Sequence, residues 1–226
     1  MKYHRAFHRS AVLAVLLLAA SVSSAQKKEL VEALSYDGLQ EIKVKGIDMA
    51  YALPGATLSG YKQVMIDPVN VLFAKNWKPQ ETGSRRDLST NDVERIRSNV
   101  AKLVHDTFID ELKKGGYTVA AAPGPDVLEV RPGIINLYVT APDTMSAGRS
   151  RTYTTSAGEM TLVAELADSV TGQVIVRVLD RYRARDTGNF RMSSSVDNAN
   201  EARTAALSWA KILRDGLDKA KDIGSN

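Results

Sequence analysis

A single apolar stripe runs through residues 93–112. Its members recur at spacings of three and four, which places them on one side of an α-helix of about six turns. They are Val93, Ile96, Val100, Leu103, Val104, Phe108 and Leu112. Thr90, Asn91 and Asp92 offer caps at the start, and Gly115–Gly116 ends the helix because glycine readily takes the left-handed conformation. Such a helix needs an apolar surface to cover.

Strand patterns on both sides of this helix predict a sheet that it could cover. Apolar residues alternate over 160–166 and over 174–178, and the segment 168–172 between them predicts a hairpin turn. Further strands are predicted over 64–73, 117–121 and 127–139.

Two prolines interrupt these strands. Pro68 cannot donate to a ladder and predicts an edge strand or a bulge, and Pro132–Gly133 predicts a bulge or a bend. The segments 141–158 and 187–196 are expected to be loops.

A second amphipathic helix is predicted near the C-terminus. Asn198 and Glu201 have the spacing of a capping box. The apolar stripe that follows consists of Ala202, Ala205, Ala206, Trp209, Leu213 and Leu217. Two long amphipathic helices and several alternating strands predict an α+β fold, in which a mostly antiparallel sheet and the helices form a two-layer sandwich.

The first 25 residues have the pattern of a cleavable export signal. A basic segment is followed by ten apolar residues over 11–20, and the small residues Ser23 and Ala25 favour cleavage after Ala25. The apolar run is about half the length that a membrane span needs. We therefore predict a signal peptide (1–25), a polar arm or linker (26–45), one domain (46–222) and a frayed tail (223–226), and no membrane span in the mature chain.

Cysteine content and charge narrow the expected partners. The chain has no Cys, and Gln26 would occupy the first mature position, where a bacterial lipoprotein needs Cys, so we expect no lipid anchor of that kind. The full chain has 30 Lys and Arg against 26 Asp and Glu. Lys2, Arg5 and Arg9 would leave with the signal, so the mature chain is nearly neutral and no nucleic-acid partner is expected.

Few residues of the mature chain could carry catalysis. Its one histidine, His105, lies beside the apolar stripe, which favours a helix-boundary position. No nucleotide-binding glycine motif or nucleophile elbow is present in the sequence. The remaining candidates are Asp67, Asp168 and Asp180, although turn and pre-proline aspartates usually bond locally. We predict no catalytic residue, metal site or cofactor.

Two arginine–tyrosine segments are candidate contacts for a ligand or partner. One is the loop with Arg149, Arg151 and Tyr153. The other is the strand end with Arg181, Tyr182, Arg183 and Arg185, whose period of two places the three arginines on one face of the strand. Arginine suits carboxylates and phosphates, and tyrosine can stack on sugars. The alternative for the strand end is a solvated face whose arginines pair with Asp180 and Asp186.

Trp77 is a further candidate contact, because it lies in a polar segment between Lys75 and Lys78. An exposed aromatic side chain there could take part in binding.

Three segments resemble a bacterial family known as domain of unknown function 3313. They are Tyr36–Leu39, Leu58–Val69 with its Tyr-Lys-x-Val-x-Ile-Asp-Pro-Val motif, and Leu162–Gly172 with the returning strand to Asp180. The resemblance implies a small exported protein without an assigned activity. Many such proteins are lipoproteins, and this chain departs from that pattern by lacking the Cys.

The order of elements is also similar to that of small envelope domains such as the curli-secretion lipoprotein and the N-terminal domain of the Tol translocation protein. This likeness of fold implies an accessory or assembly role. We therefore expect a non-enzymatic envelope protein, located in the periplasm or secreted, that acts through contacts with another envelope protein. The alternatives are a periplasmic hydrolase that uses carboxylates and a binder of glycans or small ligands.

Overall fold

The structure is a computed structural model that describes residues 24–77, 89–139, 152–154, 158–183, 191–193 and 195–224. It has the predicted α+β fold with a mixed, mostly antiparallel sheet. In chain order the elements are α1 (Ser24–Ser35), the 3₁₀ turn η3 (Tyr36–Gly38), β1 (Gln40–Ile42), β2 (Met49–Ala52), β3 (Gln63–Ile66), β4 (Asn70–Phe73), α2 (Thr90–Lys114), β5 (Thr118–Val119), β6 (Val127–Val139), β7 (Thr152–Thr154), β8 (Gly158–Asp168), β9 (Val174–Arg183), β10 (Arg191–Ser193) and α3 (Ser195–Gly224). No helix in these described ranges is long and apolar enough to cross a membrane.

The main sheet has the strand order β1-β2-β9-β8-β6-β3-β5, and β4 also pairs with β6. The pairs from β1 to β6 are antiparallel, whereas β3 and β4 run parallel to β6, and β5 runs parallel to β3. β7 and β10 form a separate two-stranded sheet. The segments 141–158 and 187–196, predicted as loops, therefore each contain a short strand.

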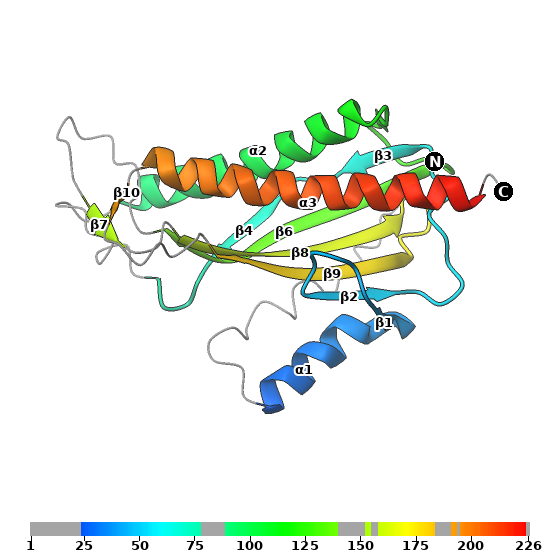
Figure 1. Cartoon of the computed structure of the whole chain (residues 1–226), viewed down its shortest axis with the longest axis horizontal. Coiled ribbons are helices and arrows are strands. Elements are labelled where there is room, and N and C mark those ends of the chain that lie inside the picture. Colours follow the sequence, from blue (N-terminus) through cyan, green and yellow to red (C-terminus); the bar gives the residue numbers. More distant parts are fainter. Residues whose placement is uncertain are drawn as a thin grey trace, which may run out of the picture.

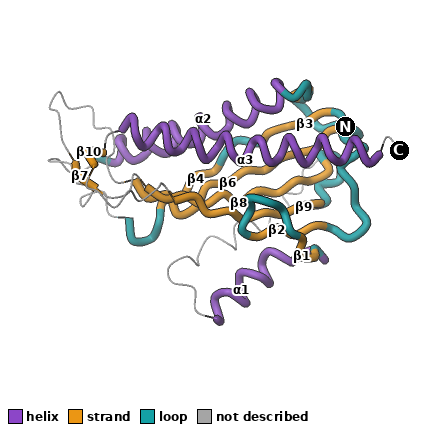
Figure 2. Tube along the Cα trace, in the orientation of Figure 1, coloured by secondary structure: helices purple, strands orange, loops and turns teal. Residues whose placement is uncertain are grey.

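The helices lie on opposite faces of the sheet. α2 and α3 run side by side over one face, which we call the inner face, and α1 lies against the other, the outer face (Figures 1 and 2). The prediction of two helices in two layers lacked this third helix. The largest apolar cluster lies between the inner face and the two long helices, and it includes Phe108, Leu162 and Trp209.

The ends of α2 agree closely with the prediction. The N-cap is Ser89, one residue before the expected caps, and its hydroxyl accepts a hydrogen bond of 3.2 Å from the Asp92 amide. The Asp92 carboxylate accepts in return from the Ser89 amide at 3.1 Å, which completes a capping box. At the other end Gly116 has a φ of +78°, the conformation expected of a helix-terminating glycine.

α3 is longer than predicted at both ends. It begins at Ser195, so Asn198 and Glu201 lie inside the helix rather than at its start. Glu201 accepts a hydrogen bond of 2.7 Å from the Tyr182 hydroxyl and so links α3 to β9. The helix continues to Gly224, which places part of the predicted frayed tail in regular structure.

The predicted hairpin turn is confirmed. The Asp168 carboxylate accepts hydrogen bonds from the amides of Val170 and Thr171 at 3.1 and 2.7 Å. Gly172 has a φ of +75° and donates its amide to the Asp168 carbonyl at 2.8 Å. These local bonds explain why the turn could be predicted from its own residues.

Proline has different effects at its two positions in the sheet. Pro68 lies between β3 and β4, so the segment predicted as one strand with an edge position or a bulge is two strands. Pro132 pairs with Ala164 without a break, so the bulge or bend expected there is wrong. It lies where β6 changes partner from β3 to β4, a point at which a missing donor is tolerated. The register shift occurs instead between Ile135 and Tyr138, where Asn136 has a φ of +53°.

The interpretation of residues 26–45 as a linker or frayed arm is wrong. This segment contains most of α1, the turn η3 and β1, which is a strand of the main sheet. Leu34 and Leu39 are buried against Tyr51, Val163 and other residues of the outer face. The weak apolar spacing that the sequence shows here is therefore enough to anchor one turn of helix.

Replacing the α2 cap should lower stability measurably. We expect Ser89→Ala to reduce the free energy of unfolding by about 1 kcal/mol, because the Asp92 amide loses its acceptor. Urea unfolding followed by circular dichroism measures the change. Ser98→Ala, at an exposed position in the middle of the same helix, is the matched control and should not destabilise. An equal loss in both variants would contradict a capping role for Ser89.

Candidate functional site

The strand end Arg181–Tyr182–Arg183 lies in β9, and its side chains alternate between the two faces. Arg181 and Arg183 share the outer face, as predicted, where both contact Glu159 of β8. The Arg183 Nε lies 3.0 Å from a Glu159 oxygen, and that of Arg181 lies 3.8 Å away. Their carboxylate partner is thus a residue on the neighbouring strand.

Tyr182 points to the inner face. It packs beside the largest apolar cluster and donates its hydroxyl to Glu201 of α3. The structure therefore separates Tyr182 from the arginines with which it was grouped, because successive side chains of a strand point in opposite directions.

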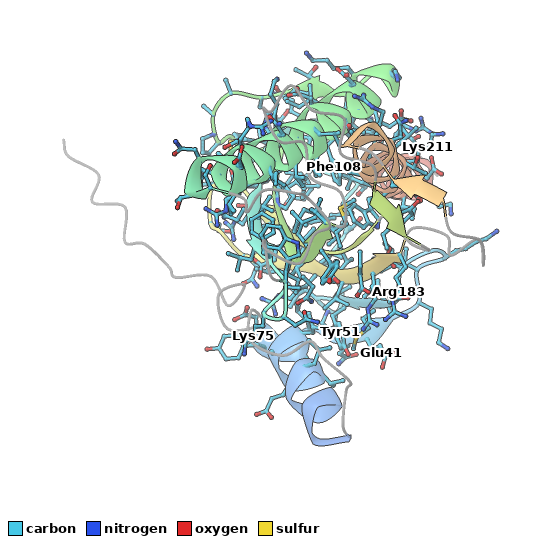
Figure 3. The ribbon with its side chains drawn as sticks, turned by 90° about the vertical axis from the view of Figure 1, so that its left-hand side faces the viewer. Glu41, Tyr51, Lys75, Phe108, Arg183 and Lys211 are labelled. Atoms are coloured by element: carbon cyan, nitrogen blue, oxygen red, sulfur yellow. The ribbon has the colours of Figure 1, made fainter. Side chains whose placement is uncertain are left out.

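Tyr138 lies in the same row as Arg183, and Leu72 lies on the same face of the neighbouring β4. The backbone register places Tyr138 of β6 opposite Glu159, and Glu159 opposite Arg183. Leu72 of the neighbouring β4 is 39% exposed and Tyr138 is 36% exposed, while the Arg183 side chain is 64% exposed. We call the set Leu72, Tyr138, Glu159, Arg181 and Arg183 the distal outer surface. Figure 3 shows Arg183 on the same side of the sheet as α1.

Trp77 is not an exposed contact, and the prediction that it could be one is wrong. Its side chain is only 8% exposed, and its ring stacks on Phe73 with centroids 4.1 Å apart. The indole Nε1 donates to the Val139 carbonyl at 3.0 Å. The polar neighbours of Trp77 in the sequence concealed this core position, which is set by the end of β4 and by β6.

The other predicted contact segment lies mostly outside the described residues. This applies to Arg149 and Arg151, and also to Arg185 and Asp186 beyond the end of β9. Tyr153 lies in β7, where its backbone is paired with Met192 of β10.

The candidate carboxylates do not share one site. Asp168 ends β8, whereas Asp180 pairs with Leu162, six residues earlier in the same strand. At about 3.4 Å per residue the two aspartates are about 20 Å apart. Asp67 lies in the junction between β3 and β4, where its amide donates to the Val130 carbonyl. In the described part of the chain no cluster of His, Asp and Glu could hold a metal ion.

Asp180 lies between the sheet and α3. Its carboxylate accepts from the Trp209 indole at 2.7 Å and from the Asp48 amide at 2.9 Å. Burial raises the pKa of Asp180, and the Trp209 bond opposes that rise. His105 is half-buried on α2 with its Nδ1 3.5 Å from Asp106, the boundary position predicted for it. Each of these groups thus has a local structural partner.

The structure also contains a row of polar residues that the sequence did not single out. The register aligns Glu41, Tyr51, Arg177, Glu165 and Arg131 across β1, β2, β9, β8 and β6. Arg177 is 1% exposed and Glu165 is fully buried, and their nearest charged atoms are 2.8 Å apart. The second Glu165 oxygen has no hydrogen-bond partner and lies 3.7 Å from Arg131.

The guanidinium of Arg177 also holds the end of α1. Its Nη1 donates to the carbonyls of Ala33, Leu34 and Tyr36 at 3.3, 3.1 and 3.2 Å, and its Nη2 donates to the Asp37 carboxylate at 3.1 Å. The last carbonyls of a helix lack partners within the helix, so one side chain here satisfies several of them. The only sequence signal for this role is a lone arginine among the apolar residues of 174–179.

Removing Arg177 alone should be more damaging than removing it together with its partner. We expect Arg177→Met to lower the free energy of unfolding by about 3–5 kcal/mol, because Glu165 stays buried without its main counter-ion. The double variant Glu165→Leu/Arg177→Met should recover a large part of that loss. Denaturant unfolding of the three chains measures this cycle. Arg181→Met, on the same strand but exposed, should change stability by about 1 kcal/mol or less. Equal losses for Met at 177 and 181 would contradict the role given to Arg177.

Tyr61 should make the protein sensitive to alkaline pH. Burial and its 3.0 Å hydrogen bond to Asp168 raise the pKa of Tyr61 to about 12. Between the ordinary value near 10 and 12 the folded chain keeps a proton that the unfolded chain loses, so this stabilising contribution decreases as pH rises. We therefore expect the stability advantage of the parent chain over Tyr61→Phe to shrink between pH 9 and pH 12, as measured by urea unfolding. An unchanged advantage, with Tyr61 titrating near 10 by NMR, would contradict this.

No curated protein matches the chain. Among solved structures it is similar to a DUF330 protein from Xanthomonas campestris, at 10% identity and a TM-score of 0.42 over 73% of this chain and 91% of that one. It is also similar to the PelC dodecamer from Paraburkholderia phytofirmans, at 10% identity and a TM-score of 0.35 over 79% of this chain and 95% of that one. A DUF4136 family protein from Bacteroides thetaiotaomicron is similar at 9% identity and a TM-score of 0.35 over 80% of this chain and 98% of that one. Likenesses at this level do not extend to assembly or activity.

A match to a family model covers far more of the fold than any motif does. The model described as "Protein of unknown function (DUF3313)" matches residues 26–213. This range begins in α1 and ends within α3, so it includes every strand described above. The chain therefore belongs to the DUF3313 family, as its Tyr-Lys-x-Val-x-Ile-Asp-Pro-Val segment and its Asp168–Gly172 turn predicted.

Proposed function

We propose that the protein is an exported, non-enzymatic accessory protein of the bacterial envelope and that the distal outer surface contacts its partner protein. The observation that carries this proposal is the group of exposed side chains that β4, β6, β8 and β9 place on one face of the sheet. Arginine and tyrosine are enriched at the centres of protein interfaces, and an exposed leucine beside them adds apolar area. The surface combines these residue types on a rigid sheet rather than on a loop.

The charges of this surface suit a partner with an acidic group. Arg183 is 64% exposed although Glu159 lies 3.0 Å away. An exposed pair of this kind contributes little to stability, so the guanidinium can exchange its partner at small cost. A carboxylate brought by another protein would compete directly with Glu159 for Arg183. Arg181, which is 38% exposed, offers a second guanidinium on the same face.

The positions of Asp168 and Asp180 favour a binding role for the protein over a hydrolytic one. Asp168 holds the hairpin turn and accepts from Tyr61, and Asp180 connects β9 to Trp209 and to the start of β2. The backbone amide of Thr171 is the main cause that lowers the pKa of Asp168, which keeps its carboxylate charged and bound within the turn. Hydrolysis by a carboxylate pair needs two such groups facing one substrate. The separation of about 20 Å between these two aspartates does not provide that geometry.

Export is part of the same proposal. The basic and apolar segments of residues 1–25 support secretion with cleavage after Ala25, and the absence of Cys supports a mature protein without a lipid anchor. The mature chain would start at Gln26, within α1. The proposed location is the periplasm, or the medium if the protein is secreted.

Site-specific crosslinking in cells tests the contact surface. A photo-crosslinking phenylalanine derivative at position 183 or 138 should give a discrete adduct with the partner protein. The adduct should be found in the periplasmic fraction, and this chain within it should begin at Gln26. Charge reversal by Arg181→Glu/Arg183→Glu should reduce the adduct from position 138 at least tenfold, because a complementary acidic group would be repelled.

The matched control uses the opposite face. The same crosslinker at Lys102, which is exposed on α2, should give no such adduct, and Lys102→Glu should leave the adduct from position 138 unchanged. Loss of the adduct with Lys102→Glu as well as with the two arginine reversals would indicate a general charge effect. Adducts at neither 183 nor 138 would overturn the proposed contact surface, and saturable turnover of a substrate by the purified chain would overturn the non-enzymatic role.

A further inference from the structure

α1 is attached to the outer face mainly through its C-terminal end. Leu34 is fully buried, whereas Leu30, Val31 and Ala33 are only partly buried and Glu32 is exposed. The start of the helix points away from the sheet, as two views show (Figures 1 and 3). A helix of 12 residues is marginal by itself, so its order depends on this contact.

Residues of the sheet around Arg177 bind the C-terminal end of α1. Arg177 lies beneath α1 with its guanidinium directed at three main-chain carbonyls and one carboxylate. A positive charge at this end is also favoured by the helix dipole. Apolar side chains of the sheet, among them Val163 and Leu179, pack in the same cluster as Leu34. The surface thus recognises a backbone pattern and one leucine.

Water could satisfy the polar part of this contact if α1 moved away, whereas Leu34 and the apolar side chains around it would lose their packing. The carbonyls of α1, the Asp37 carboxylate and the Arg177–Glu165 pair are all polar, and a buried ion pair regains hydration when it is uncovered. The inner face differs because Phe108, Trp209 and Leu217 would expose large apolar surfaces. Local opening with the rest of the fold intact is therefore easiest at α1.

We infer that the outer face around Arg177 is a binding site for the C-terminal end of a helix, which the chain's own α1 fills and which a partner helix takes by displacing α1. The partner segment carries a leucine four residues after another apolar residue, free carbonyls at its last turn and an acidic residue three positions beyond the leucine. This is the pattern of Leu30, Leu34 and Asp37. The inference rests on the proposed function only in that the protein acts through protein contacts.

A peptide copy of the chain's own α1 and η3 serves as the probe for this site. A fluorescent peptide with the sequence of residues 26–38 is added to the full mature chain, and binding is followed by anisotropy. The variant Leu34→Asp releases α1 in the chain but leaves the receiving residues unchanged. We expect this variant to bind the peptide at least 30-fold more tightly than the parent chain, in which α1 competes at high effective concentration.

Two matched controls test the recognition. A peptide that itself carries Leu34→Asp should bind at least tenfold more weakly to the variant chain. Adding Arg177→Lys to that chain keeps the charge opposite Glu165 but removes the planar fork, and should also reduce affinity at least tenfold. No saturable binding to a folded Leu34→Asp chain, or equal affinity for the two peptides, would overturn the inference.

Hydrogen exchange on the unmodified chain gives a test that needs no variant. Amides of the last turn of α1 should exchange at least 100-fold faster than those of β8, because α1 opens without global unfolding. If both exchange at the same slow rate, α1 is an integral part of the fold and the inference fails. Crosslinks at position 183 without peptide binding would refute this inference alone, while peptide binding without those crosslinks would refute only the proposed contact surface.

Discussion

The buried pair of Arg177 and Glu165 connects the N-terminal segment to the centre of the sheet. Glu165 lies in β8, which has a strand on either side, and Arg177 extends the pair to the carbonyls at the end of α1. A buried arginine is tolerated only if its donors are used, and here the carboxylate and four further acceptors use them. One guanidinium therefore joins α1 and η3 to the sheet, while β1 is held by its pairing with β2.

The two faces of the sheet differ in chemistry, and this pair belongs to the more polar one. The inner face is apolar along β8, where Met160, Leu162, Ala164 and Leu166 pack toward the long helices. The outer face carries Glu165 and Arg177 at one end and Glu159 and Arg183 at the other. Burial separates these two ion pairs. The first is covered and structural, and the second is open to water and to a partner.

The outer face is thus the more promising place for contacts of the protein with others. One end holds its own helix through polar bonds, and the other presents arginines, a tyrosine and a leucine on a rigid sheet. Neither end needs a catalytic group, which is consistent with carboxylates such as Asp168 and Asp180 that serve a turn and a helix contact. Both proposed contacts would leave the inner face and its apolar core unchanged.

Local patterns were sufficient for the elements that local bonds define. The course of α2 from Thr90 to Lys114, the turn at Asp168 and the alternation of β8 follow from caps, a turn-forming aspartate and a period of two. By itself the sequence thus determined the fold class, the family and the position of Arg181 and Arg183 on one face.

Tertiary structure alone decided which polar or isolated residues are buried. Trp77 lies in a polar segment, yet it packs against Phe73 and Val139. Arg177 is a lone charged residue in the apolar segment 174–179, yet it is buried against Glu165 and the end of α1. Residues 26–45 are ordered for the same reason. Each of these groups is buried by at least one neighbour that is distant in the sequence, such as Val139 for Trp77 and Leu34 for Arg177. The periodicity of a single segment does not identify such neighbours.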